Sequence, residues 1–239
     1  MYKPKIKLFA DGADPKGMFE MYNSGIVSGY TTNPTLMRKA GIQNYKEFAK
    51  MVLKCIPDMP ISLEVFTDNL KDMEKEAREI SSWGDNVYVK IPVTNSVGVK
   101  TDPVISKLSY NGIKLNITAI LTSEQVHQVV LSLNPDIPSI ISVFAGRIAD
   151  TGRDPIETMR NSLPMIKSYQ PNSELLWAST RELFNIIQAK QCGCHIITVT
   201  NDILKKLPMI GKDLNQLSLE TVQQFKNDAE ASGYRILND

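Results

Sequence analysis

Short runs rich in Val, Ile and Leu recur along the whole chain, and amphipathic stretches long enough to form helices lie between them. We interpret eight of these runs as strands: residues 6–10, 26–31, 61–66, 87–93, 114–121, 139–144, 174–178 and 195–199. They start about 27 residues apart on average, which is the length of one βα unit. The alternation predicts an α/β fold with a parallel sheet and outer helices. Eight units favour a closed (β/α)8 TIM barrel, although an open doubly wound sheet has the same strand count.

Two local signals support the helices between the strands. Thr122 precedes Ser-Glu-Gln, so Gln125 can complete a capping box that starts a helix over residues 123–133. Glycine readily adopts the left-handed conformation that ends many helices. Four glycines stand between an amphipathic segment and the next strand, and each is predicted to cap the preceding helix: Gly25, Gly84, Gly112 and Gly193.

One helix is left over after the eighth unit. Residues 218–233 carry Leu219, Val222 and Phe225 three positions apart, and no strand follows them. We therefore expect a catalytic barrel domain over residues 1–217 and a C-terminal helix and tail over residues 218–239. The helix could be a lid packed on its own barrel or an arm that grips a neighbouring subunit, and the sequence leaves both open.

The composition is that of an ordinary globular protein, with 42% hydrophobic and 22% charged residues among 239. Lys and Arg number 27 against 26 Asp and Glu, without a dense basic run, so nucleic acid is not expected as a partner. Neither a signal peptide nor a transmembrane stretch is recognisable, and three cysteines fit free thiols in a reducing cytoplasm. Cys192-Gly-Cys194-His195 resembles a metal-binding fragment but lacks further ligands, so we expect it to pack in the core and expect no metal site.

A lysine lies in the middle of a predicted buried strand. Lys90 shares its face of the strand with Tyr88 and Pro92, while Val89 and Ile91 point the other way. Burial among apolar neighbours favours the neutral amine, which can attack a carbonyl carbon. The alternative is that Lys90 extends from the strand end to water.

The other predicted strands also end in polar residues, which are costly to bury unless they are paired or used. These are Asp11, Thr31 with Asn33, Glu64, Asn116 with Thr118, and Ser142 beside Phe144. Any one of them could make an ordinary structural hydrogen bond. Together, at successive strand ends, they indicate the catalytic mouth of a barrel.

Two arginines follow the sixth and seventh predicted strands, where barrels commonly bind phosphate. Arg147 lies in Phe-Ala-Gly-Arg, and Arg181 lies in Ala-Ser-Thr-Arg beside Ser179. Guanidinium groups and a hydroxyl suit phosphate oxygens. The competing interpretation is salt bridging, of Arg147 to Asp150 and of Arg181 to Glu182.

In order along the chain, these segments resemble the transaldolase family, in particular its short branch that includes the fructose 6-phosphate aldolases. The resemblance runs from Phe9 to about Leu207. It rests on Phe9-Ala-Asp-Gly, Gly29-Tyr-Thr-Thr-Asn-Pro-Thr, Tyr88-Val-Lys-Ile-Pro-Val-Thr, Gly112-Ile-Lys-Leu-Asn-Ile-Thr-Ala, Ser142-Val-Phe-Ala-Gly-Arg-Ile and Ala178-Ser-Thr-Arg.

The resemblance implies a role for each candidate residue. Lys90 would form the imine with a ketose phosphate, Asp11 would be the acid-base group, and Glu64 and Thr118 would hold a water molecule for proton transfer. The residues implied to bind the three-carbon unit are Asn33, Asn116 and Ser142, with Thr31 and Phe144 lining the same part of the site. Those implied to bind the phosphate are Arg147, Ser179 and Arg181. Neither a metal nor an organic cofactor is implied.

Within the family, Glu64 and Phe144 stand where the aldolase branch tends to carry glutamine and tyrosine, which favours transaldolase over release of dihydroxyacetone. The alternatives are a fructose 6-phosphate aldolase-type enzyme and, in another class, a non-catalytic barrel that senses sugar phosphates. Short members of the family resemble ring-forming homo-oligomers, with pentamers or decamers expected. The sequence departs from the family pattern at Thr180, at Trp177, at Thr200-Asn-Asp and over residues 95–109, a loop that could cover the mouth.

Overall fold

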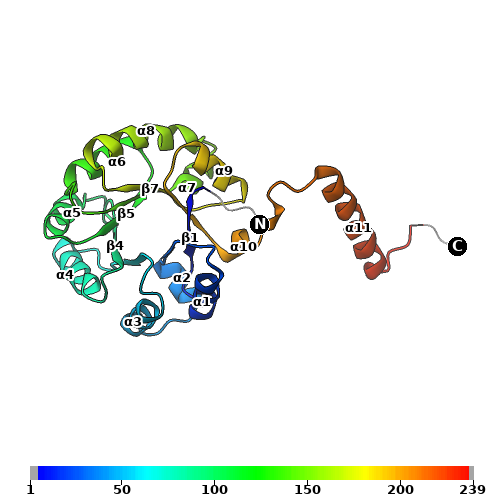
Figure 1. Cartoon of the computed structure of the whole chain (residues 1–239), viewed down its shortest axis with the longest axis horizontal. Helices are drawn as coiled ribbons and strands as arrows, with labels where there is room; N and C mark the ends of the chain where they lie inside the picture. The colour runs from blue at the N-terminus through cyan, green and yellow to red at the C-terminus, as the bar shows by residue number, and fades with distance from the viewer. Residues whose placement is uncertain (1–4, 237–239) are drawn as a thin grey trace. The chain divides into compact units, whose positions relative to one another are not determined.

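A closed barrel of eight parallel strands forms the main body of the computed structural model, which describes residues 5–236 (Figure 1). The strands follow one another around the barrel in chain order, and the last pairs with the first. They are β1 (Lys7–Asp11), β2 (Gly29–Thr31), β3 (Ile61–Glu64), β4 (Val87–Pro92), β5 (Leu115–Ile120), β6 (Ile140–Val143), β7 (Glu174–Trp177) and β8 (Ile196–Val199). The eight predicted strands and the TIM barrel are confirmed, and closure excludes the open sheet.

Helices surround the barrel; all lie between successive strands of the chain except the last of them, which follows β8 (Figure 1). They are α1 (Pro15–Ser24), α2 (Pro34–Lys39), α3 (Tyr45–Cys55), α4 (Leu70–Ser81), α5 (Asp102–Ser109), α6 (Ser123–Ser132), α7 (Ala145–Ala149), α8 (Pro155–Tyr169), α9 (Phe184–Gln191) and α10 (Asn201–Leu204). The capping box of Thr122 and Gln125 is formed at the start of α6, as predicted.

Three of the four glycines have the predicted left-handed conformation, with φ values of 64° at Gly25, 81° at Gly112 and 79° at Gly193. Gly25 is itself the cap of α1, whereas Gly112 and Gly193 follow the cap residues of α5 and α9. The prediction is wrong for Gly84, which is not left-handed; α4 ends at Ser81, with a right-handed cap. A Cβ at Gly84 would lie 3.2 Å from Oδ1 of Asn86, so close packing explains this glycine better than backbone conformation does.

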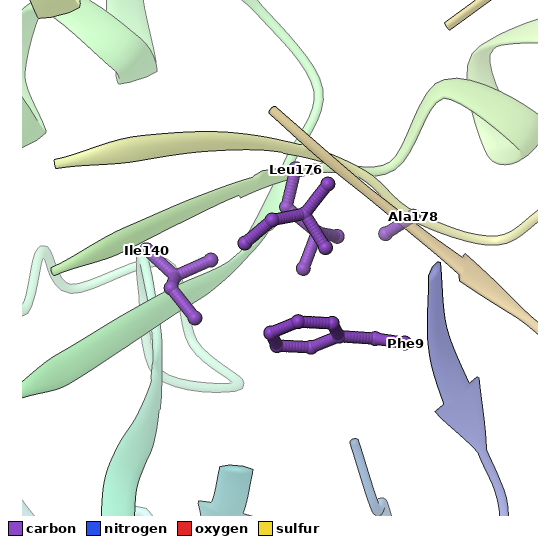
Figure 2. Close-up of a cluster of buried hydrophobic side chains, with 5 residues drawn as sticks. Phe9, Ile140, Leu176 and Ala178 are labelled. Carbon is purple, nitrogen blue, oxygen red and sulfur yellow. The ribbon is translucent and has the colours of Figure 1, made fainter. Parts of the chain in front are cut away.

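The two faces of each strand have different tasks. Outward side chains such as Val89 and Ile91 are fully buried under the helices. Inside the barrel, a plug of apolar side chains lies below the mouth: Phe9, Ile140, Leu176, Ala178 and Ile196 (Figure 2). The ring of Phe9 occupies the space beside Gly29, where any Cβ would lie 2.6 Å from the ring, so glycine is required there. The plug closes the barrel, and the inward positions nearer the carboxyl ends of the strands are polar.

The chain divides after Leu204 into the barrel and a second compact unit, earlier than the expected boundary after residue 217. The described part of the second unit contains the short helix η1 (Leu207–Met209) and α11 (Leu214–Ser232). The expected start of this last helix at residue 218 is wrong, because Asp213 caps it by accepting a hydrogen bond from the backbone N–H of Gln216. No helix within residues 5–236 is both long enough and apolar enough to cross a membrane.

Candidate active site

A cavity of about 390 Å³ opens at the carboxyl ends of the strands. It is lined by Asp11, Thr31, Asn33, Pro34, Thr35, Leu36, Glu64, Lys90, Asn116, Thr118, Ala119, Ser142, Phe144, Arg147, Leu176, Ala178, Ser179 and Thr198. Eleven of the twelve residues proposed from the sequence therefore meet in one cavity, and only Arg181 does not line it.

Lys90 lies at the floor of this cavity with 6% of its surface exposed. Its Nζ donates a hydrogen bond to the backbone carbonyl of Thr32 at 2.7 Å and lies 3.0 Å from Oε2 of Glu64. The contact with Glu64 follows from the strand register, which pairs these two residues directly. The alternative in which Lys90 extends to water is excluded. The expectation of apolar surroundings is also wrong, because the amine is held by a carboxylate and a carbonyl oxygen.

The end of β3 that carries Glu64 is fixed from outside the barrel. The hydroxyl of Tyr45 donates to the backbone carbonyl of Glu64 at 3.1 Å. One carboxylate oxygen of Glu76 accepts hydrogen bonds from the backbone N–H groups of Phe66 and Thr67, at 2.7 and 3.1 Å. These contacts hold the loop after β3, so the Glu64 carboxylate is presented to Lys90 from a rigid segment.

Asp11 faces the same cavity from the end of β1. Its Oδ1 accepts a hydrogen bond of 2.8 Å from the hydroxyl of Thr31, which lies opposite it on β2. Burial raises the pKa of the Asp11 carboxyl, while the nearby charge of Lys90 opposes that shift and Thr31 opposes it less. The raised pKa suits a group that must both take up and return a proton.

A chain of hydrogen bonds crosses three strands beside Lys90. The Ser142 hydroxyl donates to Oδ1 of Asn116 at 2.6 Å, and Nδ2 of Asn116 donates to Oγ of Ser62 at 2.9 Å. Because the Ser142 proton is used in this way, its lone pairs are what it can offer to a ligand. Ser62 was not anticipated from the sequence; its place on the face of β3 that also carries Glu64 was the available signal.

The end of β5 is irregular at the cavity. The register with β6 shifts between Ile117 and Ile120, so an extra residue is inserted, and Ala119 takes a left-handed φ of 61°. Thr118 and Ala119 consequently both line the cavity, although simple alternation would turn one of them away. The buried hydroxyl of Thr118 has no protein hydrogen-bond partner among the described residues. A bound water molecule or a ligand could satisfy it.

Asn33 contributes both structure and lining. Its Oδ1 accepts a hydrogen bond from the backbone N–H of Leu36 at 3.0 Å and so caps α2. The cap fixes the side chain at the cavity edge and leaves the amide Nδ2 as the group available to a ligand.

The far side of the cavity combines a cation with a tight backbone contact. Arg147 lines it, with its guanidinium carbon 5.6 Å from the centre of the Phe144 ring. Ser179 is left-handed, with φ of 61°, and its carbonyl oxygen would lie 1.6 Å from any Cβ at Gly146. Ser179 and Ala119 are the two non-glycine residues of positive φ in the described chain, and both line this cavity. Strained backbone is concentrated at functional sites in proteins, which supports a ligand-binding role here.

Arg181 is directed elsewhere. Its Nε donates to Oδ1 of Asp150 at 3.0 Å, and its Nη2 pairs with Oδ2 of the same carboxylate. Arg181 therefore forms a salt bridge, but with Asp150 and not with Glu182, the partner considered from the sequence, and its guanidinium is outside the cavity lining.

The departures from the family pattern lie mostly outside the cavity. Trp177 is 1% exposed on the outward face of β7 and does not line the cavity. The Thr180 hydroxyl donates to the backbone carbonyl of Thr198 and joins the loop to β8. In the segment 95–109, Ser96 is fixed to Asp68 through its backbone N–H and its hydroxyl, and none of the segment's residues lines the cavity.

The described residues contain no group of three His, Cys, Asp or Glu side chains that could hold a metal ion. Cys192 and Cys194 are both buried, as expected for core positions. Burial raises the pKa of the Cys194 thiol to about 12. That thiol is therefore uncharged at neutral pH.

A closed parallel barrel with its polar side chains gathered at the carboxyl ends of the strands is the architecture of (β/α)8 barrel enzymes. The sequence profile of the family described as "Transaldolase/Fructose-6-phosphate aldolase" matches residues 8–236. The chain belongs to this family, and the resemblance found in its motifs is confirmed.

Individual relatives agree. A "Probable transaldolase" of Thermoanaerobacter sp. is 32% identical over 231 residues, covering 97% of this chain and 100% of the relative. One of Streptococcus agalactiae is 36% identical over 202 residues, covering 84% and 89%. Among solved structures, 3-hexulose-6-phosphate synthase from Salmonella typhimurium superposes with a TM-score of 0.58 at 13% identity, covering 84% of this chain and 91% of that one. The last comparison supports the barrel fold alone.

Proposed function

We propose that the chain is a transaldolase that moves a dihydroxyacetone unit from a ketose phosphate of the fructose 6-phosphate type to an aldose phosphate, through a Schiff base on Lys90. The observation that carries the proposal is a buried lysine, 3.0 Å from a carboxylate, in a cavity that also contains Asp11 and Arg147. These are the groups that imine chemistry on a phosphorylated sugar requires.

The covalent step begins at the amine. Glu64 takes the proton that Lys90 must lose before its lone pair can attack the C2 carbonyl of the ketose, and the 3.0 Å separation supports direct transfer. Loss of water from the adduct gives the imine. The hydroxyl of Thr118 has no partner within residues 5–236, and a water molecule bound to it and to Glu64 would carry protons during formation and hydrolysis of the imine.

Carbon–carbon cleavage follows. Asp11 takes the proton of the C4 hydroxyl, the C3–C4 bond breaks with its electron pair moving into the iminium, and the aldose phosphate leaves. A three-carbon enamine stays on Lys90. The lone pairs of Ser142 and the amides of Asn33 and Asn116 hold its hydroxyl groups, while Arg147 and Ser179 bind the phosphate of the leaving or accepting sugar.

The side chain of Phe144, which lines the cavity, favours transfer of the three-carbon unit over its release as dihydroxyacetone. Release of dihydroxyacetone requires a proton on the enamine carbon, and Phe144 has no hydroxyl to donate one. The enamine therefore persists until its carbon attacks the carbonyl carbon of an aldose phosphate, which re-forms the iminium on Lys90 while Asp11 returns its proton to the new C4 hydroxyl. This is the defining step of a transaldolase.

Borohydride trapping tests the proposal. Incubation with fructose 6-phosphate and reduction should add a three-carbon unit to Lys90, located by peptide mapping, and erythrose 4-phosphate added before reduction should remove it. Lys114→Met is the matched control, since Lys114 donates to the Asp85 carbonyl outside the cavity and its loss should leave trapping intact. Free dihydroxyacetone as the main product would indicate the aldolase, and no adduct with any ketose phosphate would favour the sugar-phosphate sensor.

We further propose that α11 is an assembly arm in a homo-oligomer, rather than a lid. Its apolar residues Leu219, Val222 and Phe225 recur at helical spacing, and none of the residues of α11 is buried. Val222→Asp is expected to lower the molar mass measured by light scattering after gel filtration, whereas Asn227→Asp on the same helix should leave it unchanged. An unchanged mass with an altered KM in Val222→Asp would instead support the lid.

A further inference from the structure

We propose that the Asp150 carboxylate is paired with the guanidinium of Arg181 in the absence of substrate. Arg181 then binds phosphate only when a phosphate dianion replaces Asp150 as its partner. Asp150 is then a residue that sets the affinity of the site: it competes with the phosphate for Arg181 and weakens the binding of phosphorylated ligands. The inference rests on the proposed function for the identity of that ligand as a phosphate ester.

The first support is the geometry of the ion pair. Arg181 follows Ser179 by two residues, so its backbone starts beside the cavity. Its side chain nevertheless pairs with Asp150 through two nitrogens and two oxygens. This two-pronged arrangement is the one that arginine also makes with phosphate, so the carboxylate fills the same donors that a phosphate would use.

The second support is the position of Asp150 relative to both arginines. The hydrogen bond and charge of Arg181 lower the pKa of Asp150, and the charge of Arg147 lowers it further. Asp150 therefore lies in the electrostatic field of the cavity arginine as well as that of its own partner. One carboxylate partly neutralises both cations from outside the cavity, where a phosphate would neutralise them from inside.

The exposure of the pair makes exchange feasible. The side chains of Arg181 and Asp150 are 48% and 51% exposed, and ion pairs this exposed change equilibria by no more than about five-fold. A phosphate monoester carries roughly −1.5 to −2 charges at neutral pH and presents three oxygens. It can thus replace the carboxylate on Arg181 while also contacting Arg147. An uncharged sugar does not engage Arg181, so competition by Asp150 lowers the affinity of phosphorylated ligands alone.

The opposite role is also chemically reasonable, because a carboxylate can hold an arginine in the orientation needed for binding. The two roles differ in sign. If Asp150 competes with phosphate, its neutral isostere tightens phosphate binding; if Asp150 orients Arg181, the same variant weakens it.

Calorimetric titration with inorganic phosphate distinguishes them without any turnover. Asp150→Asn is expected to lower the phosphate Kd by up to about five-fold, and the effect should vanish in an Arg181→Met background. Glu182→Gln, which removes one negative charge from the neighbouring residue, is the matched control and should change the Kd less. Thermal melts of each variant verify that the fold is retained.

A higher or unchanged Kd in Asp150→Asn overturns the proposal, as does an equal gain in the Arg181→Met background or the absence of phosphate binding in every variant. Because binding needs no imine, these outcomes are independent of borohydride trapping at Lys90. If Lys90 is trapped but Asp150→Asn does not bind phosphate more tightly, only the role of Asp150 is rejected. If Asp150→Asn binds phosphate more tightly but no adduct forms on Lys90, only the transfer reaction is rejected.

Discussion

Lys90→Met is expected to lower kcat for transfer from fructose 6-phosphate to erythrose 4-phosphate by on the order of 10⁴-fold or more, the scale on which loss of a covalent nucleophile is felt. Methionine keeps an unbranched side chain of similar reach but has no nitrogen to form the imine. The remaining donors around the cavity can still bind the ketose, so binding should weaken far less than kcat falls. Initial rates and a direct ketose titration would measure the two effects separately.

The same substitution should also destabilise the protein. Lys90 is the partner of the Glu64 carboxylate and of the Thr32 carbonyl, and its loss leaves both poorly satisfied inside the barrel. The expected decrease in unfolding free energy is on the order of 2 kcal/mol. A second substitution, Glu64→Gln, should restore part of it without restoring activity. Transfer in Lys90→Met at more than about 1% of the original rate would contradict covalent catalysis at this position.

The architecture was accessible from the sequence because its signal is repeated. Eight apolar runs separated by helix-length segments determine the strand order of a barrel, and an error at one boundary does not affect the rest. The last helix had no such repetition. Its start at Leu214 depends on a single cap, Asp213, and the apolar pattern alone placed it later. Local hydrogen bonds decide element ends, and hydrophobic periodicity does not report them.

The sequence predicts which residues of the candidate site face the interior of the barrel, but not which atoms they contact. Alternation along β4 correctly assigns Lys90 to the interior, but it cannot say which atom of the adjacent strand Lys90 meets. That depends on the register between β3 and β4, which pairs Lys90 with Glu64 and turns an expected apolar environment into an ion pair.

Two further features lie beyond periodicity altogether. Because β5 contains an inserted residue, Thr118 and Ala119 both line the cavity. A glycine in a sequence suggests a positive φ, but an alanine such as Ala119 does not. The direction of Arg181 depends on a partner 31 residues away in the chain. The inserted residue and the direction of the Arg181 side chain both depend on tertiary contacts, which the hydrophobic pattern of a single sequence does not reveal.

Asp11→Asn is the second change with a large expected effect, and it should separate activity from stability. We expect kcat to decrease by roughly 10²–10⁴-fold, because an amide cannot take the proton of the C4 hydroxyl. The hydrogen bond from Thr31 should survive, since Oδ1 of asparagine can still accept it. The variant should nevertheless be more stable than the original protein at neutral pH. Burial raises the pKa of Asp11 in the folded state, so the ionised carboxylate opposes folding, and asparagine removes that charge.

The pH dependence gives this prediction its sign. The pKa of Asp11 is higher in the folded state than in the unfolded state. The original protein therefore loses stability relative to Asp11→Asn as pH rises from the unfolded pKa through the folded pKa. At lower pH the carboxyl is protonated in both states and the two proteins should melt alike. Activity runs the other way, because only the carboxylate can accept a proton, so the original enzyme should lose activity as pH falls through the raised pKa. Thermal melts and kcat profiles over one pH series measure both trends. If Asp11→Asn melted lower at every pH, Asp11 would be a structural anchor of the barrel mouth, and the proton acceptor at C4 would have to be sought elsewhere in the cavity.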